Sequence, residues 1–363
     1  MARLPMDPSP TINPASPVQQ RLNRFTRQPD QMAARQITDK SFQVMATIER
    51  YRFAPSSLLV RLVPGGQRNN YRHLQTLYHK GFINRFALPT VYGTPGEFVY
   101  YLDTLSALHL LVEKGLLKLP EDQIRRSEEN IRLNRQRAYH QLHKDPDQQG
   151  KLLYIQHELM VSRFHALLEL TCRKFSGRVA LEQWKQGPDL WHHVEVPQVR
   201  KLEIPGQWQE LPGKEWLPHR PDAFFTLHFP GNPEGRQHSH FFYEADRGTE
   251  NATRFKMKLR AHWHFIVKQN LHRTLGCYNV HGIRAVLTES TTSQWAHNLR
   301  QAAKENVVSP KPSPLFWFTT SELLTKPTAS GKRTLPLYLV QPEVIFKRIW
   351  ADPVQDKFFN LAD

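Results

Sequence analysis

The chain of 363 residues has only two cysteines and no long apolar run. Because Cys172 and Cys277 lie in separate apolar contexts, we expect two free thiols, as is usual in a cytoplasmic protein, and no cysteine-rich zinc site. No stretch approaches the ~18 consecutive apolar residues that a membrane helix needs. The N-terminus also lacks the apolar segment of a secretory signal peptide. These absences predict a cytoplasmic protein without a membrane partner.

Several common catalytic motifs are also missing. The sequence has neither a Gly-x-x-x-x-Gly-Lys-Ser/Thr loop nor a Gly-x-Gly-x-x-Gly loop, so it does not indicate ATP or dinucleotide binding. It has no Gly-x-Ser-x-Gly nucleophile elbow. Short-spaced histidine pairs such as His238-x-His240 and His262-x-His264 have no cysteine partner, which argues against a zinc ligand set.

Acidic residues are outnumbered by basic ones. The chain has 33 Asp and Glu against 49 Lys and Arg, which gives a formal net charge of +16 and a pI near 9.9. This balance favours a polyanionic partner, because binding releases counterions and a positive field steers the encounter. Charge alone does not separate DNA from RNA or from an anionic membrane. A generally basic protein without such a partner is the other interpretation.

Length and pattern predict two compact domains with linkers. We expect a disordered basic arm, a first domain, a polar helical connector, a second domain and a tail, at residues 1–35, 36–115, 116–150, 151–350 and 351–363. The arm shows no apolar periodicity. The connector alternates charges of both signs and lacks a broad apolar stripe, which is typical of a solvated helix.

In the first domain, apolar spacing predicts three helices followed by a β-hairpin. Helices are expected at 37–51, 55–62, 68–80 and 104–115, and strands at 82–86 and 97–102. Three helices and a hairpin make a winged helix-turn-helix. The run Tyr71-Arg72-His73-Leu74-x-x-Leu77-Tyr78-x-x-Gly81-Phe82-Ile83 resembles a recognition helix that continues into its wing.

A winged helix places its third helix in the major groove of duplex DNA and its hairpin along the backbone. Polar and basic side chains of the expected third helix and the following strand suit that role, since Arg and Asn read guanine and adenine edges. The predicted DNA-binding residues are Arg68, Asn69, Asn70, Arg72, His73, Thr76, Lys80 and Arg85. A protein-binding winged helix or an ordinary solvated helix face is the alternative.

The second domain is expected to alternate helices and strands. The pattern predicts a helix, short strands and loops, a helix, a strand, a helix, a strand and two strand-like tail segments, at 152–174, 179–220, 252–267, 283–288, 293–305, 315–319, 336–340 and 344–346. Strand-helix-strand units of this length form a parallel pair with a right-handed crossover.

Between these elements, two aromatic-rich runs flank a Gly/Pro-rich turn at 230–235 and predict a pair of strands. Asp222 lies at the start of the first strand, and Glu244 and Asp246 lie at the end of the second. Residues two apart on a strand face the same way, so these carboxylates are expected to share one space. Their repulsion is relieved if a cation lies among them. Hard oxygen ligands in this arrangement suit Mg²⁺ or Mn²⁺.

This layout resembles the PD-(D/E)XK nuclease fold, in which Pro-Asp and a downstream (D/E)-X-K hold a divalent metal. More narrowly, Glu244-Ala-Asp246-Arg-Gly248-Thr249-Glu250 is similar to the E-x-D-r-G-T segment of the replication-relaxation family of bacterial and plasmid proteins. The resemblance covers roughly residues 36–330. It implies an α+β protein whose N-terminal winged helix-turn-helix is joined to a C-terminal PD-(D/E)XK nuclease-like α/β domain.

The same resemblance implies roles for individual residues. Asp222 and Glu244 would hold Mg²⁺ or Mn²⁺, and Glu158 from the first core helix would be a further ligand. Asp246 stands where the nuclease pattern has its Lys. Lys258 from the following helix is then implied as the catalytic Lys, with Asp246 as an additional ligand or water-orienting group.

Two functions follow from these features. One is a DNA-binding, metal-dependent endonuclease, most simply a nicking enzyme, of plasmid or mobile-element replication or relaxation. The other is a DNA-binding accessory, scaffold or regulatory protein whose nuclease-like domain is degenerate. In both cases the expected partner is double-stranded DNA, with other replication or mobile-element proteins as possible partners.

Overall fold

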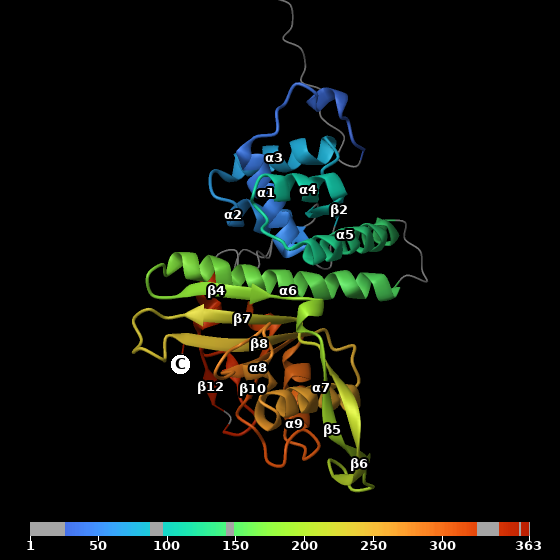
Figure 1. Cartoon of the computed structure of the whole chain (residues 1–363), viewed down its shortest axis with the longest axis vertical. Coiled ribbons are helices and arrows are strands. Elements are labelled where there is room, and N and C mark those ends of the chain that lie inside the picture. The colour runs from blue at the N-terminus through green and yellow to red at the C-terminus, as the bar shows by residue number, and fades with distance from the viewer. Residues whose placement is uncertain (1–25, 88–96, 143–148, 325–340, 356, 363) are drawn as a thin grey trace, which may run out of the picture.

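The computed structural model describes residues 26–87, 97–142, 149–324, 341–355 and 357–362. They form a mixed α+β structure, as the sequence predicts. A mainly helical N-terminal unit lies on one side of the long helix α6 (Gln149–Lys174), and a seven-stranded sheet lies on the other (Figure 1). In this described part of the chain, every helix is too short or too polar to cross a lipid bilayer.

The N-terminal unit combines four helices with a three-stranded antiparallel sheet of order β1-β3-β2. Its elements are α1 (Asp39–Tyr51), β1 (Ala54–Pro55), α2 (Ser56–Leu62), α3 (Gln67–His79), β2 (Ile83–Ala87), β3 (Phe98–Leu102) and α4 (Leu105–Glu113). The helices and the two hairpin strands agree with their predicted positions to within two residues. The apolar period of a helix therefore identified the predicted helices correctly, and the strand pattern identified the hairpin.

Local chemistry explains where the two central helices of this unit begin and end. α1 begins at Thr38, whose side chain and backbone exchange contacts with Ser41 in a capping box. α3 ends at Lys80 because Gly81 adopts φ +85°, the left-handed conformation that terminates a helix most easily with glycine. These two helices pack against each other and bury the apolar stripe that contains Met45 and Leu77.

Part of the segment predicted as a disordered arm, 1–35, packs against this unit. Residues 1–25 lie outside the described residues. The described remainder includes the 3-10 turn η1 (Asp30–Met32). There Arg27 donates to the Asp103 carboxylate (2.6 Å) and to backbone carbonyl oxygens of α3 and β2. A charge-assisted bond of this kind fixes the segment against the end of α3.

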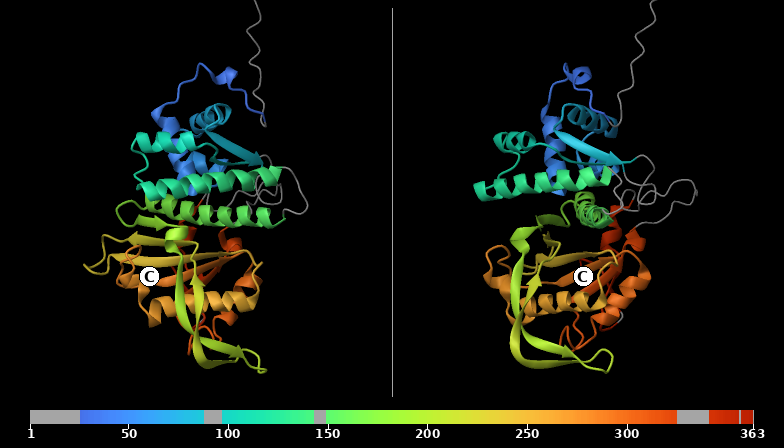
Figure 2. Two further views of the ribbon diagram at one scale, coloured as in Figure 1. Left: turned by 45° about the vertical axis from the view of Figure 1, so that its right-hand side comes forward. Right: turned by 90° about the vertical axis from the view of Figure 1, so that its right-hand side faces the viewer.

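The expected polar connector, 116–150, is mostly the helix α5 (Glu121–Leu142), which lies along α6 (Figure 2). Among the residues of α5 whose side chains are described, Ile131, Asn134 and Ala138 are buried, and most of the others are polar. The connector thus packs against the rest of the protein through a narrow apolar line.

Helix α6 holds the two units together. The Ser162 hydroxyl donates to the backbone oxygen of Tyr51 (2.8 Å), and the Tyr51 hydroxyl donates to the Glu169 carboxylate (2.6 Å). The ring of His165 is stacked on both Tyr51 and Trp184, with centroid distances of 4.5 and 4.1 Å. Side chains of α1, α6 and the first strand of the large sheet therefore form one continuous stack.

The large sheet has the strand order β12-β11-β10-β9-β8-β7-β4. Its members are β4 (Ala180–Lys185), β7 (Ala223–His228), β8 (His238–Asp246), β9 (Ala285–Ser290), β10 (Phe316–Thr320), β11 (Trp350–Ala351) and β12 (Phe358–Phe359). β4, β7 and β8 are antiparallel neighbours, whereas β9 is parallel to both β8 and β10. The predicted parallel pair is confirmed, with α9 (Ser293–Ala302) as its crossover.

Alternating strand residues give the sheet two apolar faces. Phe225 and Phe241 pack towards α6, in the core that continues into the N-terminal unit. Phe224 and Phe242 pack in a separate core with α7 (Ala252–Trp263) and α9. A π-helical turn, η4 (His264–Lys268), and the short α8 (Leu271–Thr274) follow α7.

Two regions of the second domain differ from the prediction. The part expected as short strands and loops contains the 3-10 turn η3 (Pro188–Leu190) and a long ribbon of β5 (His192–Lys201) and β6 (Trp208–His219). The tail segment 344–346, expected as a strand, lies in the 3-10 turn η5 (Pro342–Phe346) after α10 (Ser321–Leu324). The other tail segment, 336–340, lies outside the described residues.

Candidate functional site

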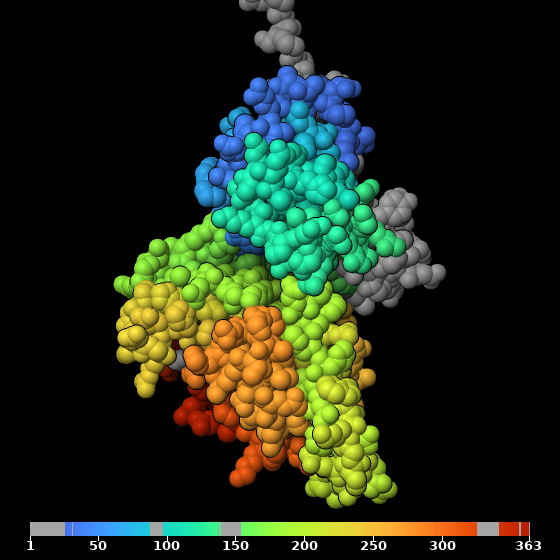
Figure 3. Space-filling view, in the orientation of Figure 1, coloured from blue at the N-terminus to red at the C-terminus, as the bar shows by residue number. Residues whose placement is uncertain are grey.

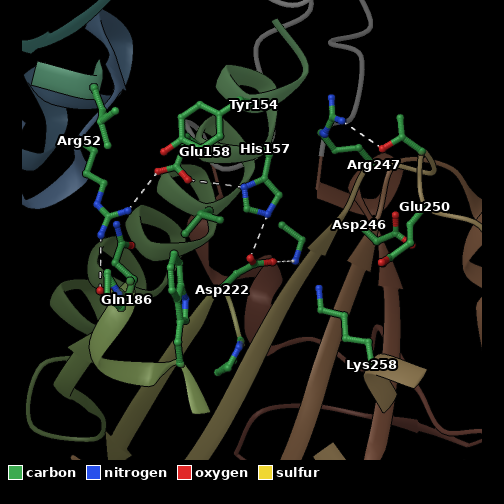
Figure 4. A pocket seen from close by; sticks show the side chains of 18 of the residues that line it. Arg52, Tyr154, His157, Glu158, Gln186, Asp222, Asp246, Arg247, Glu250 and Lys258 are labelled. Atoms are coloured by element: carbon green, nitrogen blue, oxygen red, sulfur yellow. Dashed lines mark hydrogen bonds and ion pairs between the residues drawn. The ribbon is translucent and has the colours of Figure 1, made fainter. Parts of the chain in front are cut away.

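A cavity of about 920 Å³ lies where the two units meet. The N-terminal half of α6, the start of β7, the end of β8 and α7 form its main walls, and Arg52 reaches it from the end of α1 (Figure 4). Four of the five residues with predicted catalytic or metal-binding roles line it: Glu158, Asp222, Asp246 and Lys258. The fifth, Glu244, is 1% exposed and pairs with Lys258 at the wall.

Asp222 is held by the strand pairing and by a histidine. Its backbone N–H donates to the oxygen of Tyr243 (3.1 Å), and its carboxylate accepts the backbone N–H of Ala245 (2.8 Å). The other carboxylate oxygen lies 3.1 Å from Nε2 of His157. Burial alone would raise the pKa of Asp222, but the charges of His157 and Lys258 hold it well below its usual range. Asp222 is therefore ionised.

His157 links two carboxylates of the site. Its Nδ1 lies 3.6 Å from Glu158, and its Nε2 faces Asp222. Burial would lower the pKa of His157, but the two carboxylates raise it to about 10, so the ring carries a positive charge at neutral pH. Glu158 also lies 3.6 Å from the guanidinium of Arg52. Burial opposes ionisation of Glu158, yet His157 and Arg52 lower its pKa.

Lys258 extends from α7 to Glu244 rather than to solvent. Its ammonium forms an ion pair with Oε2 of Glu244, and its side chain is 27% exposed. Burial would lower the pKa of Lys258, but Glu244 and Asp222 raise it, so the ammonium remains charged. The other oxygen of Glu244 lies 2.7 Å from Nε2 of His262, whose Nδ1 lies 3.0 Å from Nε2 of His219. Glu244 is thus held from two sides.

Asp246 lines the cavity, but its oxygens bind neighbouring protein groups. One accepts the backbone N–H of Gly248 (2.7 Å), and the other accepts the indole N–H of Trp295 (2.9 Å). Gly248 has φ +74° and Trp295 packs closely on it, so the loop after β8 is tightly folded. Asp246 therefore orders this loop. Glu250 follows in the loop, and burial raises its pKa despite the nearby charge of Lys258.

The carboxylates predicted to bind a divalent cation are already paired with protein groups in this arrangement. Within the described residues, no group of three or more His, Cys, Asp or Glu side chains is placed to hold a metal ion. Each predicted ligand already faces a protein cation: Asp222 faces His157, Glu244 faces Lys258, and Glu158 faces both Arg52 and His157. The negative charge of the carboxylates is compensated by these cations.

Three residues of the site, His157, His262 and Arg52, were not predicted from the sequence. His157 directly precedes Glu158. His262 lies four residues after Lys258, a spacing that places His262 and Lys258 on one face of their helix. The adjacent Glu158 and the nearby Lys258 were thus the sequence features that could have indicated His157 and His262. Arg52 had none, because it comes from a distant part of the chain. It reaches Glu158 from the end of α1, where it adopts φ +59°.

The predicted DNA-binding residues divide into two groups. Arg68, Asn69 and Arg72 are exposed on the N-terminal half of α3. The prediction for Asn70 is wrong, because Asn70 is 1% exposed and its amide donates to the backbone oxygens of Val60 and Val63 at the end of α2. Its polarity serves the packing of two helices and not a ligand.

The other predicted DNA-binding residues already contact protein groups. Thr76, which was expected on the solvent face, is buried, and the Nδ1 atom of His73 lies 3.0 Å from the Ser41 hydroxyl. The ammonium of Lys80 lies 3.5 Å from a backbone oxygen of the 26–35 segment. Arg85 is stacked between the rings of Tyr78 and Phe98, at 3.9 and 4.4 Å.

The chain matches a protein-family model. The model of the family described as replication-relaxation matches residues 45–277, which is more than half of the chain. This range begins in α1 and ends just after α8, so it includes the exposed half of α3 and every residue of the cavity named above. No curated protein and no solved structure gave a significant match.

Proposed function

Because this chain belongs to the replication-relaxation family, we propose that it binds DNA during plasmid or mobile-element replication or relaxation and cleaves one strand at the cavity. Its N-terminal unit is a winged helix-turn-helix that binds duplex DNA. Its C-terminal unit is a nuclease of the PD-(D/E)XK type. The family match supports the general role, and the geometry of the two units supports the finer assignment.

The N-terminal unit supports duplex binding through its element order and its exposed cations. Three helices precede the hairpin β2–β3, and α3 directly precedes β2, as in a winged helix. Arg68, Asn69 and Arg72 lie exposed on one half of α3, where they can meet base edges or phosphates. We therefore assign duplex contact to this half of the helix.

One observation carries the nuclease assignment: three charged residues from separate elements converge at one cavity. Asp222 precedes β7, Glu244 is on β8 and Lys258 is on α7. Strand register brings the carboxylates together, because Ala223 pairs with Tyr243. Lys258 then reaches Glu244, whereas a degenerate site would leave this side chain free to point into solvent.

At the cavity, Lys258 and His157 present positive charge to a phosphodiester. A fixed ammonium stabilises the charge that develops on a phosphate during cleavage, and a preformed site does so without reorganisation. Asp222 and Glu244, the expected ligands of Mg²⁺ or Mn²⁺, already face protein cations. The assay below therefore compares cleavage with and without these metals.

A non-catalytic DNA-binding scaffold is the second candidate. The observation that favours it is the complete internal pairing of the acids, with no metal-binding cluster in the part of the chain that the structure describes. In that case the C-terminal unit would bind other proteins of replication or of a mobile element.

A plasmid-nicking assay separates the two candidates. The full chain is incubated with supercoiled plasmid in Mg²⁺, Mn²⁺ or EDTA, beside an Asp222→Ala/Glu244→Ala variant and Lys258→Met. The exposed Lys347 provides a matched control, Lys347→Met. Nicking that both site variants lose and the control keeps would support the nuclease. Salt-sensitive DNA binding without nicking in any buffer would refute it and leave the scaffold.

A further inference from the structure

Two exposed tryptophans lie on or beside the β5–β6 ribbon: Trp216 is in β6, and Trp191 directly precedes β5. Trp216 is 64% exposed and Trp191 is 49% exposed, unlike the buried Trp317 and Trp350. Figure 3 shows the ribbon at the surface of the molecule beside α7. Large exposed aromatic side chains that do not pack in a core often mark a binding surface.

The register of the ribbon shows that the two rings share one face. Val194 and Leu217 are paired and buried, so they point inwards against η4 and α7. The out-of-phase pair Glu195–Trp216 therefore points outwards. Trp191 precedes β5 in an extended conformation, so the alternation of strand residues places it on the same side as Glu195. Trp216 pairs with Glu195, which is four residues after Trp191. Four residues of extended strand span roughly 13 Å, which separates the two tryptophans along the ribbon.

This face is continuous with the cavity. Trp191 lines the cavity together with Asp222 and Lys258. The guanidinium of Arg220 lies 5.3 Å from the centre of the Trp191 ring, so a cation accompanies the aromatic side chain at the rim. From the cavity outwards, the surface therefore presents the charged site first, then Trp191 with Arg220, and then Trp216.

We propose that this outer face binds an unpaired DNA strand that passes into the cavity, with its bases stacked on Trp191 and Trp216. The proposal rests on the proposed function and specifies its substrate. Stacking on aromatic rings requires the exposed faces of bases, which a duplex conceals, whereas a single strand offers them without regard to sequence. Arg220 and Lys258 supply positive charge for the accompanying phosphates.

Binding is tested apart from cleavage, in EDTA, with the full chain and fluorescein-labelled oligothymidine or a duplex of equal length. Trp191→Ala and Trp216→Ala are each expected to weaken single-strand binding by about 5- to 150-fold, the range for loss of one stacking ring. Trp191→Phe should restore most of the affinity. Duplex binding through α3 should not change.

The matched control is Phe358→Ala, since Phe358 is a 52% exposed aromatic residue on β12, away from the ribbon. It should bind the single strand as the unchanged protein does. If both Trp variants bind the single strand as tightly as the unchanged protein, the proposal is overturned and this face is left to a protein partner. An equal loss for duplex and single strand would also overturn it. Single-strand binding with no nicking activity would refute the nuclease alone.

Discussion

Replacement of Lys258 by Met should reveal how strongly the Glu244 carboxylate depends on its ion pair. Met keeps most of the apolar stem and removes the ammonium. Glu244 is 1% exposed and would keep only His262 as a partner. Breaking a buried ion pair costs about 3–5 kcal/mol, because the remaining charge is left without compensation. Since Lys258 is 27% exposed, we expect the lower end, about 3 kcal/mol.

A double-mutant cycle separates this interaction from the loss of side-chain packing. In Glu244→Gln/Lys258→Met no uncompensated charge remains, so the double variant should lose less stability than the sum of the two single variants. Residues in contact couple by about 0.5–3 kcal/mol, and we expect a value in the upper half of that range.

The assay is equilibrium urea unfolding at pH 7, followed by circular dichroism. Lys347→Met, at an exposed lysine, serves as the control and should change the free energy of unfolding by less than about 0.5 kcal/mol. A cost below about 1 kcal/mol for Lys258→Met would refute the reasoning, because it would mean that Glu244 is solvated or protonated without its partner. Strict additivity in the cycle would refute it as well.

Three further predictions concern residues outside this pair. Asn70→Ala should lower the free energy of unfolding by about 2 kcal/mol, since two amide hydrogen bonds are lost, and should leave duplex affinity unchanged, as measured by urea unfolding and DNA titration. Gly187→Ala should cost about 1–3 kcal/mol, because Gly187 has φ +97° and a Cβ would lie 2.6 Å from the guanidinium of Arg52; if the clash contributes, Gly187→Ala/Arg52→Ala should lose less than the two single variants together. Burial lowers the pKa of His165 well below its ordinary 6.5, so its contribution to stability is complete above that pH and declines as the pH falls below it. As the pH falls from 8 to 5, the stability of His165→Phe, measured by thermal unfolding, should therefore fall less than that of the unchanged protein. An equal fall in both proteins would contradict this prediction.

The sequence could predict the part of the site that local periodicity determines. Asp222 and Glu244 lie at the same end of two neighbouring strands that pair in register. Lys258 was implied by the family resemblance, and it reaches Glu244 from α7, which follows β8 after a short loop. Arg52 could not be predicted, since its contact with Glu158 depends on how α1 packs against α6.

Two other differences have equally local causes. The helical period shows that Asn70 lies outside the apolar stripe of α3. It does not show that the end of α2 packs against Asn70. The β5–β6 ribbon contains Pro197, Pro212 and Pro218, which usually indicate loops and are tolerated here because a two-stranded ribbon has two free edges.

Helix α6 also determines how the chain can be divided. One apolar core includes Val44 of α1, Phe164 of α6 and Trp350 of β11, so the N-terminal and C-terminal units share their interior. A cut at the expected boundary near residue 150 would leave the first fragment without the helix that covers Tyr51. We therefore expect isolated fragments to aggregate and the whole chain to unfold in one transition. During synthesis, the N-terminal unit would complete its core only after α6 has left the ribosome.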